Sequence, residues 1–250
     1  TTESRAAHDL SLALVVDGMG GADAGDIASA FVREQLRRNI LQGDDPVSAL
    51  KNAGQALRIQ RPQQGMNPSG ASALLLTWNQ NTYQAAWVGA CRAFLFDGRQ
   101  TQCLFGSPED AAAKNAAHGT GTIQALGVTA TDKLRSNRTT GAWNRNQSIL
   151  LCSDGLLDGC DAALLHQVLS DTGISAQEAV EQLLYHALQG NADNNITAVL
   201  LLSLMLYLVA VGGVYVRSPM EAGTDVPVAL FLALGFYFLA KAHPDNWIPS

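Results

Sequence analysis

The sequence has few charged residues and little excess of either sign. Charged side chains make up 15% of the 250 residues, whereas about a quarter is usual for a soluble domain. The formal net charge is −6, and an acidic chain repels the phosphodiester backbone, so we expect no nucleic-acid partner. An acidic site is instead suited to divalent cations.

The cysteines are few and form no recognisable metal or redox motif. No C-x-x-C pair and no histidine cluster occurs among the four, which argues against zinc; they are Cys91, Cys103, Cys152 and Cys160. Their irregular spacing in a chain of this length favours reduced thiols in a cytoplasm over disulfides. The polar first eight residues also lack the apolar stretch typical of a signal peptide.

Apolar periodicity predicts an α+β domain over residues 1–202. Strand patterns occur at 10–16, 71–78, 82–89, 92–96, 148–152 and 195–202. Helical stripes occur at 28–40, after Asp45-Pro46, and twice after residue 155, where Ser175 and Glu178 form a capping box. Residues 100–145 are weakly patterned and permit no assignment. Runs of strands and runs of helices indicate largely antiparallel sheets.

Two uncharged apolar runs follow, at residues 196–216 and 226–240. A membrane-spanning helix needs about 20 apolar residues, so we predict that 203–250 forms an apolar helical hairpin in a membrane. The alternative is a buried hairpin of a soluble protein. Residues 196–202 belong either to a core strand or to a spanning helix, and a strand there leaves about 14 residues of the first run, roughly 21 Å of helix.

Two of the predicted strands end in an Asp-Gly pair, at Asp17-Gly18 and at Asp154-Gly155. A carboxylate at the end of a buried strand is held rigidly at the rim of a sheet. Two such rims brought together form an oxygen-ligand site for Mg²⁺ or Mn²⁺. An isolated Asp-Gly pair more often makes a turn, and we interpret Asp97-Gly98 in that way.

A series of short blocks occurs in the order found in a known enzyme family. The blocks are VVDGMGG at 15–21, AGDIAS at 24–29, GASA at 70–73, VGACRA at 88–93, ALG at 125–127, LLCSDGL at 150–156 and NNIT at 194–197. Each block is weak evidence by itself, but the ordered set over residues 10–202 is specific. It resembles the metal-dependent Ser/Thr protein phosphatases of the PPM, or type 2C, family, in their bacterial form.

The resemblance implies a fold, a reaction and a set of site residues. The fold is an α-β-β-α sandwich of two antiparallel sheets flanked by helix pairs. The reaction is hydrolysis of phosphoserine and phosphothreonine in proteins by a water held between two Mg²⁺ or Mn²⁺ ions. By position, Asp17 would bridge the ions, the Gly18 carbonyl would bind one and Asp154 the other. Asp158 matches an acid near an additional metal, and Asn194 occupies a ligand position.

Several family acids are missing from this chain. Ala90 stands where the family has an aspartate, and so does Asn194. The family's N-terminal Asn-Glu-Asp run and its phosphate-binding arginine are not identifiable. The second hypothesis is therefore a catalytically impaired phosphatase-like module that binds phosphoproteins or a kinase partner. A third, weaker hypothesis is a membrane assembly component whose phosphatase fold is incidental.

The expected partners are phosphorylated proteins, a Ser/Thr kinase system acting in signal transduction, and a membrane contacted by the C-terminal segment. The family and the reduced thiols place the catalytic domain on the cytoplasmic side of a cell membrane. A basic cluster at Arg33, Arg37 and Arg38 is able to attract phosphoproteins or anionic lipid, but we favour a solvated helix face.

Overall fold

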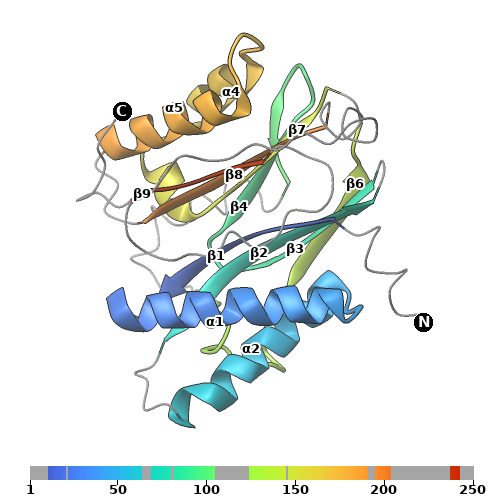
Figure 1. The fold of residues 1–250 in the computed structure, drawn as a ribbon, viewed down its shortest axis with the longest axis vertical. Coiled ribbons are helices and arrows are strands. Elements are labelled where there is room, and N and C mark those ends of the chain that lie inside the picture. Colours follow the sequence, from blue (N-terminus) through green and yellow to red (C-terminus); the bar gives the residue numbers. More distant parts are fainter. Residues whose placement is uncertain are drawn as a thin grey trace.

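A computed structural model of the chain shows two antiparallel β-sheets packed face to face between two pairs of helices (Figure 1). The structure describes residues 11–20, 22–63, 69–79, 82–104, 124–144, 146–190, 195–203 and 237–242. Helices α1 and α2 cover one sheet, and α4 and α5 cover the other (Figure 1). The α-β-β-α sandwich predicted from the sequence is therefore confirmed.

Each sheet combines strands that are distant in sequence. The first sheet has the order β1-β2-β3-β6, with β1 at Ser11–Met19, β2 at Gly70–Asn79, β3 at Thr82–Val88 and β6 at Asn137–Ala142. The second has the order β5-β4-β7-β8-β9, with β5 at Thr101–Cys103, β4 at Arg92–Phe96, β7 at Ser148–Cys152, β8 at Ile196–Leu202 and β9 at Tyr237–Ala242. The helices are α1 (Ala22–Leu41), α2 (Pro46–Gln63), the 3₁₀-helix η2 (Asp154–Asp158), α4 (Ala162–Ser170) and α5 (Ala176–Gln189).

Three apolar layers hold the sandwich together. In β7, Ile149 and Leu151 pack between the two sheets, whereas Leu150 and Cys152 pack under α4 and α5. Leu75 of β2 packs in the third layer, under α1 and α2. Side chains of a strand alternate between its two faces, and here both faces are covered. This double burial explains why the central strands are continuous apolar runs.

Local capping signals define two of the helices, as the sequence predicts. The Asp45 carboxylate accepts hydrogen bonds from the backbone N–H groups of Val47 and Ser48, at 3.0 and 3.3 Å. At α5, the Ser175 hydroxyl accepts from the N–H of Glu178 at 3.2 Å, and the Glu178 carboxylate accepts from the N–H of Ser175 at 2.7 Å. Both caps satisfy donors that a helix leaves without partners at its start.

Residues 100–145 contain two strands that the sequence pattern did not reveal. Strand β5 has only three residues, and β6 has the sequence NRTTGA, without a large apolar side chain. Both lie at sheet edges, where one flank of the strand has no partner strand among the described residues. Burial contributes little to such strands, so the apolar periodicity used for prediction is absent.

The C-terminal region differs in part from the expected helical hairpin. Residues 196–202 form β8, a strand of the second sheet, and β9 pairs antiparallel with it from Ile196↔Ala242 to Leu201↔Tyr237. The prediction of a helix was therefore wrong for residues 237–240. Pairing with β9 satisfies backbone groups along β8 that an open edge would leave exposed. Residues 204–236 and 243–250 lie outside the described residues, and so does the rest of the predicted hairpin.

Within the part of the chain that the structure describes, no helix combines the length and apolar character needed to cross a bilayer. The division into a domain at 1–202 and a segment at 203–250 stays a prediction.

Candidate metal centre

Asp17 and Gly18 lie near the end of β1, against the start of α1. The Asp17 side chain is half-buried, and its cross-strand neighbour on β2 is Ser72. Gly18 touches the backbone of Gly25 so closely that a Cβ on Gly18 would lie 2.0 Å from the Gly25 carbonyl oxygen. Gly20 follows with φ at 122°, a left-handed conformation that favours glycine. The glycines at 18 and 25 thus let the end of β1 approach the start of α1 closely, with Asp17 two residues before the strand ends.

Asp154 occupies the equivalent place at the end of β7 in the other sheet. It is the first residue of η2, is half-buried, and follows Ser153 at the point where the strand ends. Asp158 is the last residue of the same 3₁₀-helix and is exposed. The short helix therefore presents Asp154 toward the interior and Asp158 toward solvent.

The buried thiol of Cys91 connects the two aspartates across the sandwich. Burial raises its pKa well above the ordinary value, and the negative charges of Asp17 and Asp154 raise it further. Its Sγ donates to the carbonyl of Val15 on β1, at 4.0 Å. Strand β1 also contacts β7 and β8 of the opposite sheet. Both carboxylates thus act electrostatically on one buried thiol, which lies in the apolar layer between the sheets.

A buried serine organises the neighbouring turn. The Ser72 hydroxyl accepts a hydrogen bond from the N–H of Ala90 at 3.1 Å and contacts the sulfur of Met19 at 3.8 Å. Gly89 has φ at 90°, and a Cβ there would lie 2.4 Å from the Ser72 oxygen. Ala71, beside it, exchanges two backbone hydrogen bonds with Leu126, at 3.1 and 2.9 Å. Blocks that are far apart in sequence therefore meet around β2.

The structure places some predicted site residues and not others. Asp17, Gly18 and Asp154 lie at one end of the sandwich, and Asp158 lies on η2 next to it. Asn194 falls outside the described residues. Ala90 is buried and supplies no oxygen ligand in its side chain. Among the described residues, no three Asp, Glu, His or Cys side chains are placed to hold a metal ion together.

The donors present fit a hard divalent cation. Asp17 and Asp154 provide carboxylate oxygens, and Gly18 provides a backbone carbonyl beside one of them. Oxygen donors of this kind suit Mg²⁺ and Mn²⁺. The raised pKa of Cys91 keeps its thiol protonated, so it offers no thiolate to a softer metal.

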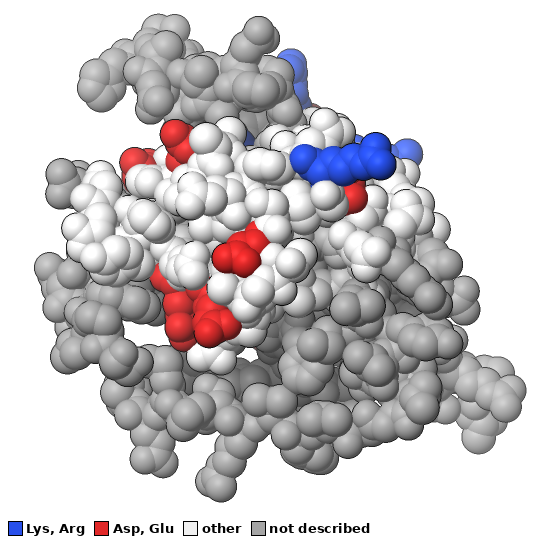
Figure 2. Space-filling model, turned by 90° about the horizontal axis from the view of Figure 1, so that it is seen from above, with Lys and Arg blue, Asp and Glu red and all other residues white. Residues whose placement is uncertain are grey.

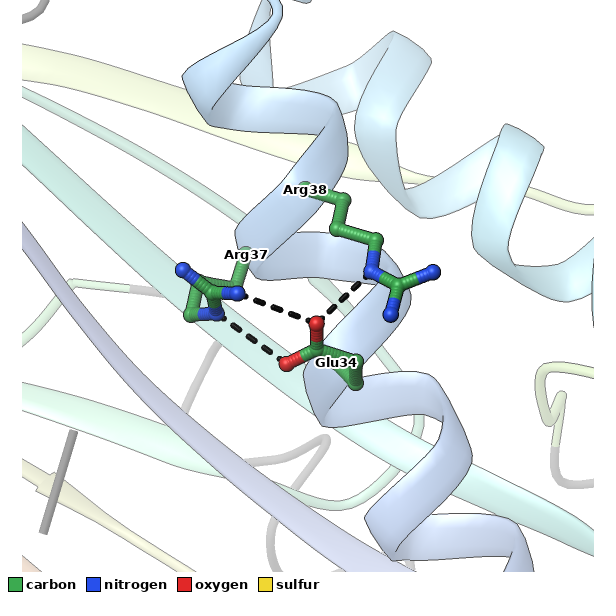
Figure 3. A network of polar contacts seen from close by, with 3 residues as sticks. All are labelled: Glu34, Arg37 and Arg38. Carbon is green, nitrogen blue, oxygen red and sulfur yellow. Dashed lines mark hydrogen bonds and ion pairs between the residues drawn. The ribbon is translucent and has the colours of Figure 1, made fainter. Parts of the chain in front are cut away.

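The basic cluster on α1 is largely paired within its own helix (Figure 3). The Glu34 carboxylate accepts two hydrogen bonds from Arg37, both at 3.0 Å, and one from Arg38 at 2.7 Å. These guanidinium groups lower the pKa of Glu34 to about 2. A guanidinium engaged in this way has fewer donors left for a phosphate, which supports the interpretation of a solvated helix face.

The sequence blocks contain further residues that hold neighbouring segments together, and only the structure shows this role. Ser72 and Ser153 are both buried, at 1% and 0% exposure, and both bind backbone groups of a neighbouring segment. The sequence signal that could have identified them is a serine among small or apolar residues near the end of a strand. Ser153 also lies directly beside a candidate ligand. Cys91 carried no such signal, because its place between the two aspartates depends on how the sheets pack.

One family profile matches part of the sequence. The sequence profile of the protein phosphatase 2C family matches residues 2–107. No curated protein sequence matches the chain.

Solved structures of bacterial phosphatases share the fold. PppA, a key regulatory component of T6SS in Pseudomonas aeruginosa, is 26% identical with a TM-score of 0.64, over 76% of this chain and 84% of that one. The S. agalactiae serine/threonine phosphatase is 18% identical with a TM-score of 0.65, over 76% and 87%.

The catalytic domain of the serine/threonine protein phosphatase PstP, solved in complex with two manganese ions, is 20% identical with a TM-score of 0.61, over 76% and 85%. The family profile over residues 2–107 and the shared sandwich show that this chain is similar to protein phosphatases of the 2C family.

Proposed function

We propose that this chain hydrolyses phosphoserine and phosphothreonine in proteins. The observation that carries the proposal is that residues 90–92 link the surroundings of both aspartates: Ala90 bonds Ser72, the cross-strand neighbour of Asp17, and Arg92 pairs with Cys152, two residues before Asp154. The fold is shared with bacterial Ser/Thr phosphatases. Such a pair of carboxylates repels a phosphate by itself and attracts it once cations are bound. The expected cofactor is a pair of Mg²⁺ or Mn²⁺ ions, the latter being what the PstP structure contains.

The chain's own residues would hold the ions. Asp17, the Gly18 carbonyl and Asp154 are the expected ligands, with Asp158 and Asn194 as further candidates. When bound, the ions would activate a water for in-line attack on phosphorus and neutralise charge on the phosphoryl oxygens.

One feature supports a mechanism without a covalent intermediate on the protein. Burial raises the pKa of Cys91, so its thiol stays protonated and is not a nucleophile.

The α4–α5 side of the molecule carries both acidic and basic side chains (Figure 2). Residues 146–203, which include α4 and α5, contain no Lys or Arg, so this segment supplies no cationic side chain to a phosphate.

The proposal is tested by metal-dependent hydrolysis of p-nitrophenyl phosphate and of a phosphothreonine peptide. Asp17→Asn should lower kcat/KM at saturating Mn²⁺ by at least about 100-fold, as expected for the loss of a strong electrostatic contact in the transition state. The matched control is Asp97→Asn, at the other Asp-Gly pair. There the carboxylate accepts from the N–H groups of Arg99 and Gln100 and interacts with the Gln100 side chain, all within one turn. Equal activity of both variants would refute the assignment.

A specific observation favours the alternative of a catalytically impaired module. Ala90 is buried, and its N–H is held by Ser72, so no carboxylate can enter at that place without a local rearrangement. In this case Asp17 and Asp154 would still shape a surface that binds phosphoproteins or a kinase partner. Phosphopeptide binding by calorimetry, with no hydrolysis at any Mn²⁺ concentration, would support this function instead.

We also propose that the chain works opposite a Ser/Thr kinase and that residues 203–250 attach it to the cell membrane, with the catalytic domain in the cytoplasm. Because β8 uses residues 196–202, about 14 residues of the first apolar run remain, roughly 21 Å of helix against a hydrocarbon layer of about 30 Å. Strand β9 likewise uses residues 237–242, which leaves residues 226–236 of the second run, so attachment needs the remaining parts of both runs. Recovery of the full chain in the carbonate-washed membrane fraction tests the proposal, and full recovery in the supernatant would contradict it.

A further inference from the structure

We propose that Ser153 is a positioning residue that fixes the end of β7, which leads into Asp154, against the start of β8. This inference rests on the proposed function for its meaning, because Asp154 is a candidate metal ligand. Ser153 has an exposed fraction of 0% and directly precedes Asp154. A buried hydroxyl needs hydrogen-bond partners, and the identity of those partners shows what this one does.

The partners of Ser153 all lie at the start of β8. Its hydroxyl accepts a hydrogen bond from the N–H of Thr197 at 3.0 Å and donates to the carbonyl of Asn195 at 3.2 Å. Its own N–H donates to the carbonyl of Thr197 at 2.9 Å. One residue thus joins the end of β7 to the start of β8 through three hydrogen bonds.

The hydroxyl extends the pairing beyond the last residues that the strands pair by themselves. The regular register between β7 and β8 ends at Cys152↔Ala198, because the chain turns into η2 at Asp154. The side chain of Ser153 reaches across from there to Asn195. Asp154 follows the bonded serine directly, so one peptide bond separates this candidate ligand from the link.

The hydroxyl makes this link instead of its usual local bond. Ser153 is the N-cap residue of η2, a position at which serine commonly accepts from a helix N–H. In this chain the N-cap side chain makes no capping hydrogen bond. The hydroxyl is therefore committed to β8, which a role confined to starting the helix does not explain.

The chain provides a matched control at the other end of the same strand pair. The N–H of Gln147 donates to the Ser203 hydroxyl at 3.1 Å, and the N–H of Ser203 donates to the Gln147 carbonyl at 3.0 Å. Ser203 is also buried, and it lies just beyond the register pair Ser148↔Leu202. Ser203→Ala removes the same kind of bond at the end of the β7–β8 pair away from Asp154.

The first experiment is amide hydrogen exchange on the full chain without metal. Ser153→Ala should speed exchange in residues 154–158 and 195–197 roughly ten-fold or more, because a buried donor and acceptor lose their partner. Ser203→Ala should leave those amides unchanged and affect only residues near Gln147. Equal protection of residues 154–158 in both variants would overturn the inference.

A measurement on the unmodified chain keeps the test decisive if Ser153→Ala does not fold. The Thr197 N–H should exchange as slowly as the amides in the middle of β8, since it is bound to a buried hydroxyl. Exchange at the rate of an exposed loop would refute the inference without any variant.

The second experiment is Mn²⁺ titration calorimetry on the same three proteins. Ser153→Ala should weaken Mn²⁺ affinity at least ten-fold, whereas Ser203→Ala should bind as the unmodified chain does. Unchanged affinity in Ser153→Ala would overturn the inference and leave the proposed function standing. Absence of Mn²⁺ binding by the unmodified chain would refute the proposed function, and the exchange data would then decide the inference alone.

Discussion

The contact between Gly18 and Gly25 gives the sharpest prediction for the architecture of the site. A Cβ on Gly18 would lie 2.0 Å from the Gly25 carbonyl oxygen and 2.4 Å from the carbonyl carbon. These are backbone atoms and cannot rotate away, so the end of β1 and the start of α1 must separate. Inserting atoms into a well-packed site typically costs about 1–3 kcal/mol, occasionally more. We expect Gly18→Ala to lower the free energy of unfolding by about 3 kcal/mol or more.

The alanine substitution on the other side of the same contact, at Gly25, should have a much smaller effect on stability. A Cβ on Gly25 would lie 3.1 Å from the Gly18 carbonyl oxygen, so the neighbour must move by only a few tenths of an ångström. Gly25 lies inside α1, where alanine is favoured over glycine by about 1 kcal/mol. The gain in helix propensity offsets the tighter contact. Gly25→Ala should therefore stay within about 1 kcal/mol of the unmodified chain.

Urea unfolding followed by circular dichroism measures both free energies under identical conditions. Gly43→Ala is a useful third variant, because Gly43 has φ at 97° and no atom lies within 4 Å of the place that a Cβ would occupy. It should show only the cost of a left-handed backbone, about 1–2 kcal/mol. If Gly18→Ala proves no more destabilising than Gly25→Ala, the close approach of β1 and α1 is not present in solution and the reasoning fails.

Two further predictions concern the helices that cover the first sheet. Asp45→Ala should lower the free energy of unfolding by about 1 kcal/mol in the same urea assay, because two N–H groups at the start of α2 lose their acceptor. Asp45→Ser should retain most of this stability, because serine also caps helices. Equal losses in the two variants would contradict the cap. The Glu34 carboxyl should titrate near pH 2 by NMR, against an ordinary pKa of 4.5, because Arg37 and Arg38 bind its charged form. The contribution of this pairing to the free energy of unfolding is then complete above about pH 4.5 and is lost as the pH falls toward 2. Because the pair is exposed, this contribution amounts to less than about 1 kcal/mol. A normal pKa for Glu34 would show that the ion pairs do not persist.

Local sequence patterns predicted some elements of this fold, whereas the remaining elements depend on contacts between distant parts of the chain. Strands with both faces buried, such as β2 and β7, were predictable because each is a continuous apolar run. The two caps were predictable because their residues lie within three positions of each other. Strands β5 and β6 were not, since edge strands bury too little to impose a pattern, and β9 was mistaken for helix because an apolar run fits either structure.

The amino-acid sequence by itself indicated the resemblance to the 2C phosphatases, the order of most elements and the identity of Asp17 and Asp154 as carboxylates near strand ends. These properties depend on short strings and on periodicity, which a linear chain already contains. Only the tertiary structure decided that both aspartates act on Cys91 and that the Ser153 hydroxyl binds β8 and does not cap its own helix. Those facts depend on the packing of two sheets face to face. Packing brings together residues that are far apart along the chain, such as Val15 and Cys91. Local sequence patterns carry no information about contacts at such a sequence separation.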